Sequence, residues 1–96
     1  MREVFPRNEF KRDLRRVARS PYRQLLVKGV EFDRVKYMLA TEIPLPPRYR
    51  DHPLHGQYEG SRDCHIRPDL VLVYTLEGED LLILERLGSH ADLFGM

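Results

Sequence analysis

The sequence predicts an α+β domain, in which two N-terminal helices pack on one face of an antiparallel sheet. Apolar residues recur at helical spacing in the first half of the chain, at Phe10, Leu14 and Val17. The second half instead contains short, nearly continuous apolar runs, of which 70–76 and 81–84 are the clearest. A chain of 96 residues has room for one domain, so we expect residues 1–96 to fold as a unit.

Prolines divide the first half of the chain into its expected elements. In chain order we predict an edge strand over 1–5, a helix from about residue 8, a helical restart over 22–27, a second helix over 31–41 and an extended loop over 43–56. Pro6 ends the strand and Ser20-Pro21 breaks the first helix, because proline removes a backbone donor. The prolines within 44–47 prevent the second helix from continuing.

Three strands are expected in the second half, over 57–66, 70–76 and 80–87. The first alternates in polarity, whereas the second is apolar at nearly every position, as in a central strand that is buried on both faces. The segments that join the strands are short enough for hairpins, so the three strands should form an antiparallel meander.

The charge is distributed unevenly along the chain, although the net charge is only +1. Residues 1–50 contain 13 Lys and Arg against 6 Asp and Glu, whereas residues 51–96 contain 3 against 9. A basic half attached to an acidic one indicates an anionic partner for the basic half, either nucleic acid or an acidic protein segment. Charge alone is equally compatible with helices that simply carry their charges in water.

Composition excludes several classes of protein. No apolar run approaches the roughly 18 residues that cross a bilayer, and the first residues lack the apolar core of a signal peptide. The single cysteine, Cys64, has no intramolecular partner for a disulfide and disfavours a thiolate-rich zinc site. A glycine-rich phosphate loop is also missing from the sequence. We therefore expect a soluble cytoplasmic protein that uses no cofactor.

The predicted meander brings three titratable residues to one edge of the sheet. In antiparallel order, the end of the first strand, the start of the second and the end of the third lie together. These places carry His65, Asp69 and His90. Strand alternation puts Cys64 and Ile66 on the apolar side, so His65 should point away from the core. Two imidazoles at one edge, both able to titrate near neutral pH, indicate a ligand or substrate site.

Each of the three edge residues also has an ordinary structural explanation. His65 is compatible with an exposed strand position, and Asp69 with a turn that follows Pro68. His90 is compatible with the cap of a strand or of a short final helix. Spacing alone does not separate these explanations from a functional site.

The sequence disfavours a metal site and additional catalytic pairs. His52 and His55 could join His65 around a metal ion, but their loop has no helical histidine spacing and no thiolate partner, so we expect no metal. Arg62-Asp63 and Glu85-Arg86 are interpreted as surface ion pairs.

Three sequence blocks, in this order, carry a resemblance to a known family. They are DHPLHG at 51–56, RDCHIRPDL at 62–70 and LERLGSHADLFG at 84–95. Together with Leu45-Pro46, these blocks resemble the YafQ branch of the RelE/ParE toxin superfamily, whose members are ribosome-dependent mRNA interferases of bacterial type II toxin–antitoxin systems. The resemblance covers essentially the whole chain, although the helical half matches only in pattern.

The resemblance implies a microbial ribonuclease fold, with the helices against a four-stranded antiparallel sheet. It implies cleavage of mRNA in the A site of the 70S ribosome, with the 2′-hydroxyl of the RNA as nucleophile and without a metal. It also implies inhibition by a cognate antitoxin, a ribbon–helix–helix dimer with an acidic, flexible C-terminal segment. The active-site positions of the family fall on His52, His65, Asp69, His90 and Phe94.

The family's chemistry assigns general roles to these residues. The imidazoles would serve as acid, base or phosphate contact, and Asp69 as a base or as the group that orients a histidine. Phe94 would stack on a codon base. Arg62 is a candidate phosphate clamp, although alternation places it opposite His65. Leu70 stands where a relative carries tryptophan, and leucine cannot stack on a base as an indole does, so the relative's codon preference is not transferred.

The basic half has two expected uses under this resemblance: it can neutralise ribosomal RNA phosphates, or it can receive the acidic antitoxin segment. The residues concerned are Arg12, Arg15, Arg16, Arg19, Arg23 and Lys28. Two other functions are alternatives to the ribonuclease. One is a non-catalytic module that binds RNA or protein, and the other is a ParE-like toxin that acts on DNA gyrase.

Overall fold

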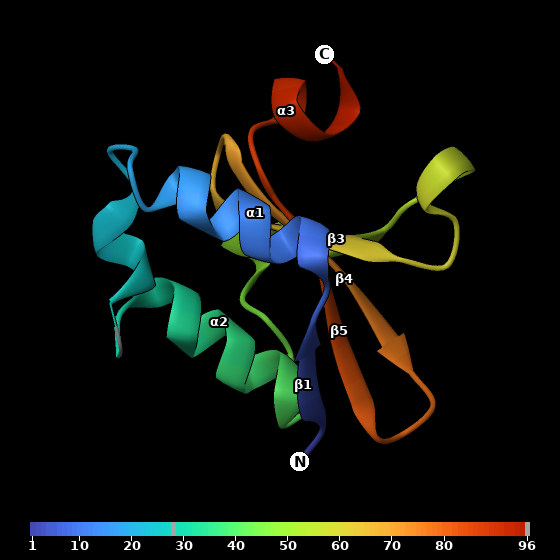
Figure 1. The fold of residues 1–96 in the computed structure, drawn as a ribbon. Helices are drawn as coiled ribbons and strands as arrows, with labels where there is room; N and C mark the ends of the chain where they lie inside the picture. Colours follow the sequence, from blue (N-terminus) through green and yellow to red (C-terminus); the bar gives the residue numbers. More distant parts are fainter. Residues whose placement is uncertain (28, 96) are drawn as a thin grey trace.

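Two helices cover one face of a β-sheet in the computed structural model, which describes residues 1–27 and 29–95 (Figure 1). The helices and strands are β1 (Glu3–Pro6), α1 (Asn8–Val17), α2 (Glu31–Ala40), β2 (His52–Pro53), β3 (Arg62–Arg67), β4 (Leu70–Glu77), β5 (Leu81–Gly88) and α3 (His90–Phe94). The connections contain the 3-10 turns η1 (Arg23–Leu26), η2 (Pro47–Tyr49) and η3 (Gly56–Tyr58). The expected α+β class is confirmed. Among the described residues, no helix is long and apolar enough to cross a membrane.

The main core lies between the two long helices and the sheet. Phe10 and Val17 of α1, with Phe32 and Val35 of α2, form apolar stripes that face the strands. The rings of Phe10 and Phe32 stack with their centroids 6.1 Å apart, which joins the helices to each other. The sheet contributes Cys64, Ile66, Leu70, Leu72, Tyr74, Leu82, Leu84 and Leu87.

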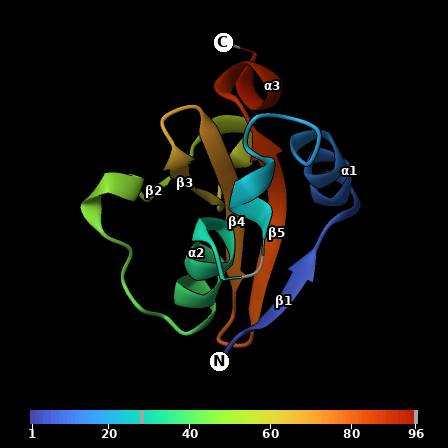
Figure 2. The ribbon, with the colours of Figure 1, turned by 90° about the vertical axis from the view of Figure 1, so that its left-hand side faces the viewer.

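The strand order corrects one sequence prediction. Within the described residues the sheet has five strands, in the order β1-β5-β4-β3-β2. The meander from β2 to β5 is antiparallel as expected, but β1 pairs in parallel with β5, from Glu3 opposite Leu81 to Pro6 opposite Leu84. Figure 2 shows β1 at the edge beside β5. A wholly antiparallel, four-stranded sheet was therefore wrong, because sequence spacing does not reveal pairing between strands at opposite ends of the chain.

Two further segments differ from expectation. The strand predicted over 57–66 begins only at Arg62, because Gly56 and Gly60 take positive φ angles of 70° and 91° and the chain turns through η3. Within the expected loop, His52 and Pro53 form β2, with His52 opposite Asp63 of β3. The predicted restart over 22–27 is the 3-10 turn η1. The short strand β2 is what carries His52 to the sheet.

The opposite face of the sheet has a smaller apolar cluster and is not covered by α1 and α2. Val71 and Val73 of β4 are fully buried beneath Leu93 of α3. Leu54, Tyr58 and Phe94 pack around these three residues. Figure 1 shows α3 following the end of β5. This second face therefore has a buried apolar centre, surrounded by partly exposed side chains.

Candidate active site

Three histidines gather on the sheet face that the long helices leave open. His52 comes from β2, His65 from β3 and His90 from the first turn of α3. The ring centroids of His65 and His90 are 5.1 Å apart in an edge-to-face arrangement, and those of His52 and His65 are 6.1 Å apart. Cys64 and Ile66, on either side of His65, are buried in the main core. Strand alternation thus turns His65 away from that core, as the sequence predicts.

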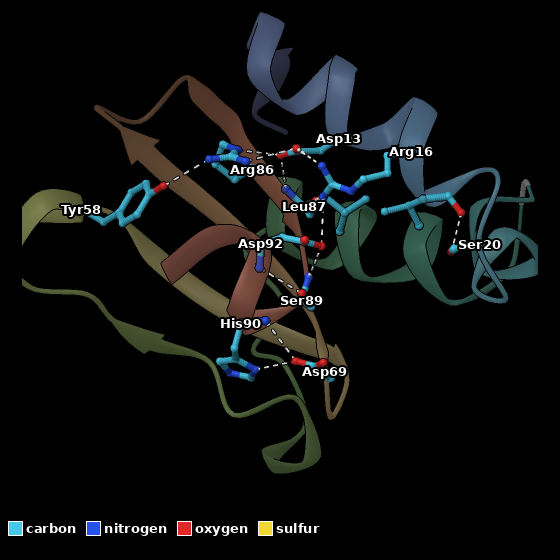
Figure 3. Close-up of polar contacts among 11 residues, drawn as sticks. Asp13, Arg16, Ser20, Tyr58, Asp69, Arg86, Leu87, Ser89, His90 and Asp92 are labelled. Atoms are coloured by element: carbon cyan, nitrogen blue, oxygen red, sulfur yellow. Dashed lines mark hydrogen bonds and ion pairs between the residues drawn. The ribbon is translucent and has the colours of Figure 1, made fainter. Parts of the chain in front are cut away.

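Asp69 orients the ring of His90. Its Oδ1 accepts a hydrogen bond from the backbone N–H of His90 at 3.0 Å and another from Nδ1 at 2.8 Å (Figure 3). These two hydrogen bonds lower the pKa of Asp69, and the bond from the backbone N–H has the larger effect. Because Nδ1 donates to the carboxylate, Nε2 of His90 is the nitrogen left to meet a substrate. The meander therefore brings His65, Asp69 and His90 to one place.

The short helix α3 is anchored by a capping box. The N–H of Asp92 donates to the hydroxyl of Ser89 at 3.0 Å, and the N–H of Ser89 donates to Asp92 Oδ2 at 3.3 Å (Figure 3). Reciprocal bonds of this kind satisfy backbone donors that a helix start leaves open. The cap sets the direction in which α3 leaves β5, and with it the position of His90.

A buried carboxylate lies beside His52 and His65. Asp63 is only 3% exposed, and its Oδ1 lies 3.0 Å from Nδ1 of His52 and 3.9 Å from Nε2 of His65. Nδ1 of His52 directs its proton to the carbonyl oxygen of Arg50, at 2.7 Å. Among the described residues, Oδ1 of Asp63 accepts no hydrogen bond. The interpretation of Arg62-Asp63 as a surface pair is therefore wrong, since the two side chains lie on opposite faces of β3.

Burial changes the proton affinity of both Asp63 and His65. It raises the pKa of Asp63, and the charges of nearby histidines partly offset this rise. Burial lowers the pKa of His65, and the charge of Asp63 opposes that decrease. His65 is therefore held in the neutral form that accepts a proton at neutral pH. The alternation of side chains along a strand is enough to predict that Asp63 and His65 share one face of β3. It does not reveal that β2 covers the carboxylate.

Arg62 lies on the opposite face from the histidines. Its Nε donates to Oδ1 of Asp51 at 3.2 Å, and the same oxygen accepts a hydrogen bond from the hydroxyl of Tyr74. These two bonds fix the chain immediately before His52. The structure therefore places Arg62 as a support for this loop and does not bring it to the histidines as a phosphate clamp.

Two aromatic rings adjoin the histidine cluster. The ring of Phe94 lies 6.1 Å from that of His90, and Tyr58 meets Phe94 edge-on at 5.7 Å. Both rings are partly exposed, so they offer a stacking surface next to the histidines. Leu70 differs, because it is 2% exposed and belongs to the main core. Position 70 of this chain therefore presents no surface to a ligand.

The predicted basic residues occupy a different surface. Arg12, Arg15, Arg16 and Arg19 are exposed on and just after α1, Arg23 is exposed in η1, and Lys28 lies outside the described residues. Arg16 turns onto α3, where it pairs with Asp92 at 3.5 Å, but no hydrogen bond or ion pair joins the described arginines of this set to a histidine. They form a separate cationic surface, which we call the α1 arginine surface.

A second buried carboxylate ties α1 to the strand that precedes His90. Asp13 is 3% exposed and accepts hydrogen bonds from Nε of Arg86 at 2.7 Å and from the N–H of Leu87 at 2.9 Å (Figure 3). Arg16 donates to Asp13 at 3.0 Å and to the carbonyl of Leu87 at 3.0 Å. The interpretation of Glu85-Arg86 as a surface pair is therefore wrong, because the partner of Arg86 is Asp13.

The histidine cluster also contains the donor atoms of a possible metal site. One donor atom each from His52, Asp63 and His65 lie within 4.8 Å of one another. Oδ1 of Asp63, which accepts no hydrogen bond among the described residues, suits a cation, and two imidazoles with a carboxylate suit a transition metal. His55, which the sequence offered only as a disfavoured further ligand, is largely exposed and lies 3.7 Å from Glu59.

Comparison with known proteins identifies the family. A family model described as the bacterial toxin of type II toxin–antitoxin system, YafQ, matches residues 2–95. The chain belongs to the YafQ toxin family. The mRNA interferase toxin YafQ of Escherichia coli strain K12 is 44% identical over 69 residues, which cover 68% of this chain and 74% of that protein. The family expected from the sequence is thus confirmed.

Solved structures extend the YafQ likeness to the whole fold. A metal-bound toxin from Helicobacter pylori superposes with a TM-score of 0.86 at 40% identity, covering 98% of this chain and 100% of that one. YafQ in the DinJ–YafQ complex of E. coli superposes with a TM-score of 0.78 at 34% identity, covering 99% and 100%. This YafQ-family chain is therefore a toxin of the type II toxin–antitoxin class.

The titration of His65 tests the electrostatics of this YafQ-family site. We expect an NMR titration of His65 to give a midpoint below 6.5, because burial disfavours the imidazolium. In Asp63→Asn the midpoint should fall further, since the charge that raises the pKa of His65 is gone. Amide dispersion of the variant checks that the fold is retained. A midpoint that rises in Asp63→Asn would contradict the assignment.

Proposed function

We propose that this toxin is an mRNA interferase, which cleaves messages in the ribosomal A site with the 2′-hydroxyl of the RNA as nucleophile. The observation that supports this most strongly is the pair formed by His65 and His90, with ring centroids 5.1 Å apart on an open face. One ring is held neutral by burial, and the other is oriented by Asp69. General acid–base catalysis needs two groups that differ in this way.

The reaction assigns a proton to each of these histidines. His65 removes the proton of the 2′-hydroxyl, and the 2′-oxygen attacks the adjoining phosphorus. The bond from phosphorus to the 5′-oxygen then breaks, and protonated His90 gives its Nε2 proton to that leaving oxygen. The products are a 2′,3′-cyclic phosphate and a 5′-hydroxyl. Asp69 keeps the ring of His90 in the orientation that this step needs, through its 2.8 Å contact with Nδ1.

The remaining site residues position the RNA. His52 lies at the far side of His65 and supplies a further donor for the charge that develops on the phosphate. Phe94, braced edge-on by Tyr58, offers its ring to a base of the codon. Since Leu70 is buried, stacking in this chain falls to Phe94 and its neighbours and not to position 70.

The α1 arginine surface supports two contacts in this proposal. Arg12, Arg15 and Arg19 are exposed and suit ribosomal RNA phosphates. The same surface suits an acidic segment of a cognate antitoxin, which we expect to be a ribbon–helix–helix dimer with a flexible C-terminal tail. An antitoxin bound there inhibits by keeping the toxin off the ribosome. Both contacts require a cytoplasmic toxin, which is the location that this proposal expects.

Primer extension on a reporter mRNA after brief induction tests the proposed function. We expect new ends within codons of the translated frame, and none when the start codon of the reporter is removed. Arrested growth with an intact message would contradict the proposal and point to a binding module or to a gyrase poison. Cuts that ignore translation would contradict the dependence on the ribosome.

The chemistry proposed here needs no metal, because imidazoles carry the protons and the RNA carries the nucleophile. A transition metal held by His52, Asp63 and His65 would occupy lone pairs that the reaction uses. We therefore expect cleavage on purified ribosomes to proceed unchanged in 1,10-phenanthroline, which leaves the Mg²⁺ of the ribosome in place. The non-chelating 1,7 isomer is the matched control. Loss of cleavage with the 1,10 isomer alone would show that a metal is required.

A further inference from the structure

A pocket of about 300 Å³ opens beside His65, next to the histidine cluster. Its walls come from the start of α2, from η2 and from the end of β3. The lining residues are Glu31, Arg48, Tyr49, Arg50, His65, Ile66, Arg67 and Pro68. His65 belongs to both the pocket and the cluster, so a molecule bound at the histidines extends directly into the pocket.

The pocket is basic, because three arginines face one glutamate. Glu31 is already engaged, since the hydroxyl of Tyr49 donates to its Oε1 at 3.0 Å and Arg67 forms an ion pair with its Oε2. The arginines therefore bring two positive charges more than the glutamate neutralises. Arg50 is close enough that its charge contributes to the lowered pKa of His65.

Arg67 is held in a position to bind a ligand. Its Nη1 donates to the carbonyl oxygen of Ile66 at 3.1 Å and makes the ion pair with Glu31. Both of these contacts use Nη1, which leaves the edge formed by Nε and Nη2 for a ligand. The side chain is 41% exposed and lines the pocket. A guanidinium edge binds two oxygens of one phosphate in parallel.

From these features we infer that the pocket binds the RNA phosphate next to the one that is cleaved, through Arg67 and Arg50. The inference rests on the proposed function, in which His65 and His90 both act at the cleaved phosphate. Consecutive phosphates of a single strand are separated by one sugar, and the pocket begins at His65. Contacts to the backbone carry no base preference, so the pocket fixes the register of the message and not the choice of codon.

The test uses ribosomes programmed with synthetic mRNAs in which one phosphate is replaced by an uncharged methylphosphonate. Replacements on either side of the cleaved bond are compared with the normal message. We expect wild-type toxin to lose about tenfold in cleavage rate at one of these two positions, the size of a charged hydrogen bond. Arg67→Gln should lose rate on the normal message, and the methylphosphonate should then cost it clearly less than it costs wild type, because one of the two arginines that bind the phosphate is already gone. In the part of the chain that the structure describes, no hydrogen bond or ion pair involves the Arg50 side chain. The Arg50→Gln variant should therefore behave in the same way.

Arg34→Gln is the matched control, because Arg34 is exposed on α2 and does not line the pocket. It should keep the rate of wild type and the full methylphosphonate effect. Equal sensitivity of wild type, Arg67→Gln and Arg50→Gln to the replacement would overturn the inference while leaving the proposed function intact. A wild-type toxin that cuts no message at all would overturn both.

Discussion

Replacing His90 by alanine is expected to slow mRNA cleavage on the ribosome by about 10²–10⁴-fold, the contribution of one general acid. The imidazole that is lost is the one that Asp69 orients through Nδ1 at 2.8 Å, and its Nε2 is assigned to protonate the leaving oxygen. The helix itself should survive, because Ser89 and Asp92 form its cap without the His90 ring. Single-turnover cleavage of a programmed message by purified toxin gives the rate.

His55→Ala is the matched control for this prediction. The same side chain is removed, but His55 is largely exposed and lies outside the histidine cluster. Its rate should stay within about twofold of wild type, in line with ordinary surface substitutions. Binding of the antitoxin and the melting temperature should be retained in both variants. Cleavage by His90→Ala at the wild-type rate would remove His90 from the reaction.

Replacing Asp13 by alanine is expected to lower the free energy of unfolding by about 3 kcal/mol. Asp13 is 3% exposed and accepts hydrogen bonds from Arg86, Leu87 and Arg16. Without the carboxylate, the partly buried guanidinium of Arg86 loses its counter-charge, and the N–H of Leu87 loses its acceptor. Urea denaturation followed by circular dichroism measures the change. For a chain of this size the melting temperature should fall by roughly 15 °C.

Glu79→Ala provides the control, because Glu79 is an exposed carboxylate in the turn between β4 and β5. Its removal should change the free energy of unfolding by no more than about 0.5 kcal/mol. An Asp13→Ala variant as stable as Glu79→Ala would show that the buried network contributes nothing net.

The part of the site that the sequence predicted follows from antiparallel order. Once β3, β4 and β5 are recognised as a meander, their ends must meet, and His65, Asp69 and His90 lie at those ends. Strand order alone predicts this juxtaposition, with no knowledge of side-chain contacts. The juxtaposition of these residues was therefore predictable, whereas their roles stay predictions.

The rest of the site depends on contacts that spacing cannot show. His52 reaches the sheet through a strand of only two residues, inside a segment that reads as a loop. Burial of Asp63 follows from that strand, because β2 pairs directly with it. The partner of Arg86 is Asp13, at a separation of 73 positions, which local patterns do not encode. The parallel pairing of β1 with β5 was not predicted either, because these strands lie at opposite ends of the chain.

The pairing of β1 with β5 also has a consequence for the order of folding. Arg7, just after β1, bonds to Glu85 of β5 across 78 positions, so this edge of the sheet closes only when β5 is available. Contacts of such long range form late, because chain entropy is lost before they stabilise anything. During synthesis β5 and His90 emerge after every other element of the sheet. Until β5 has been synthesised, β1 therefore has no strand to pair with, and this edge of the sheet cannot form.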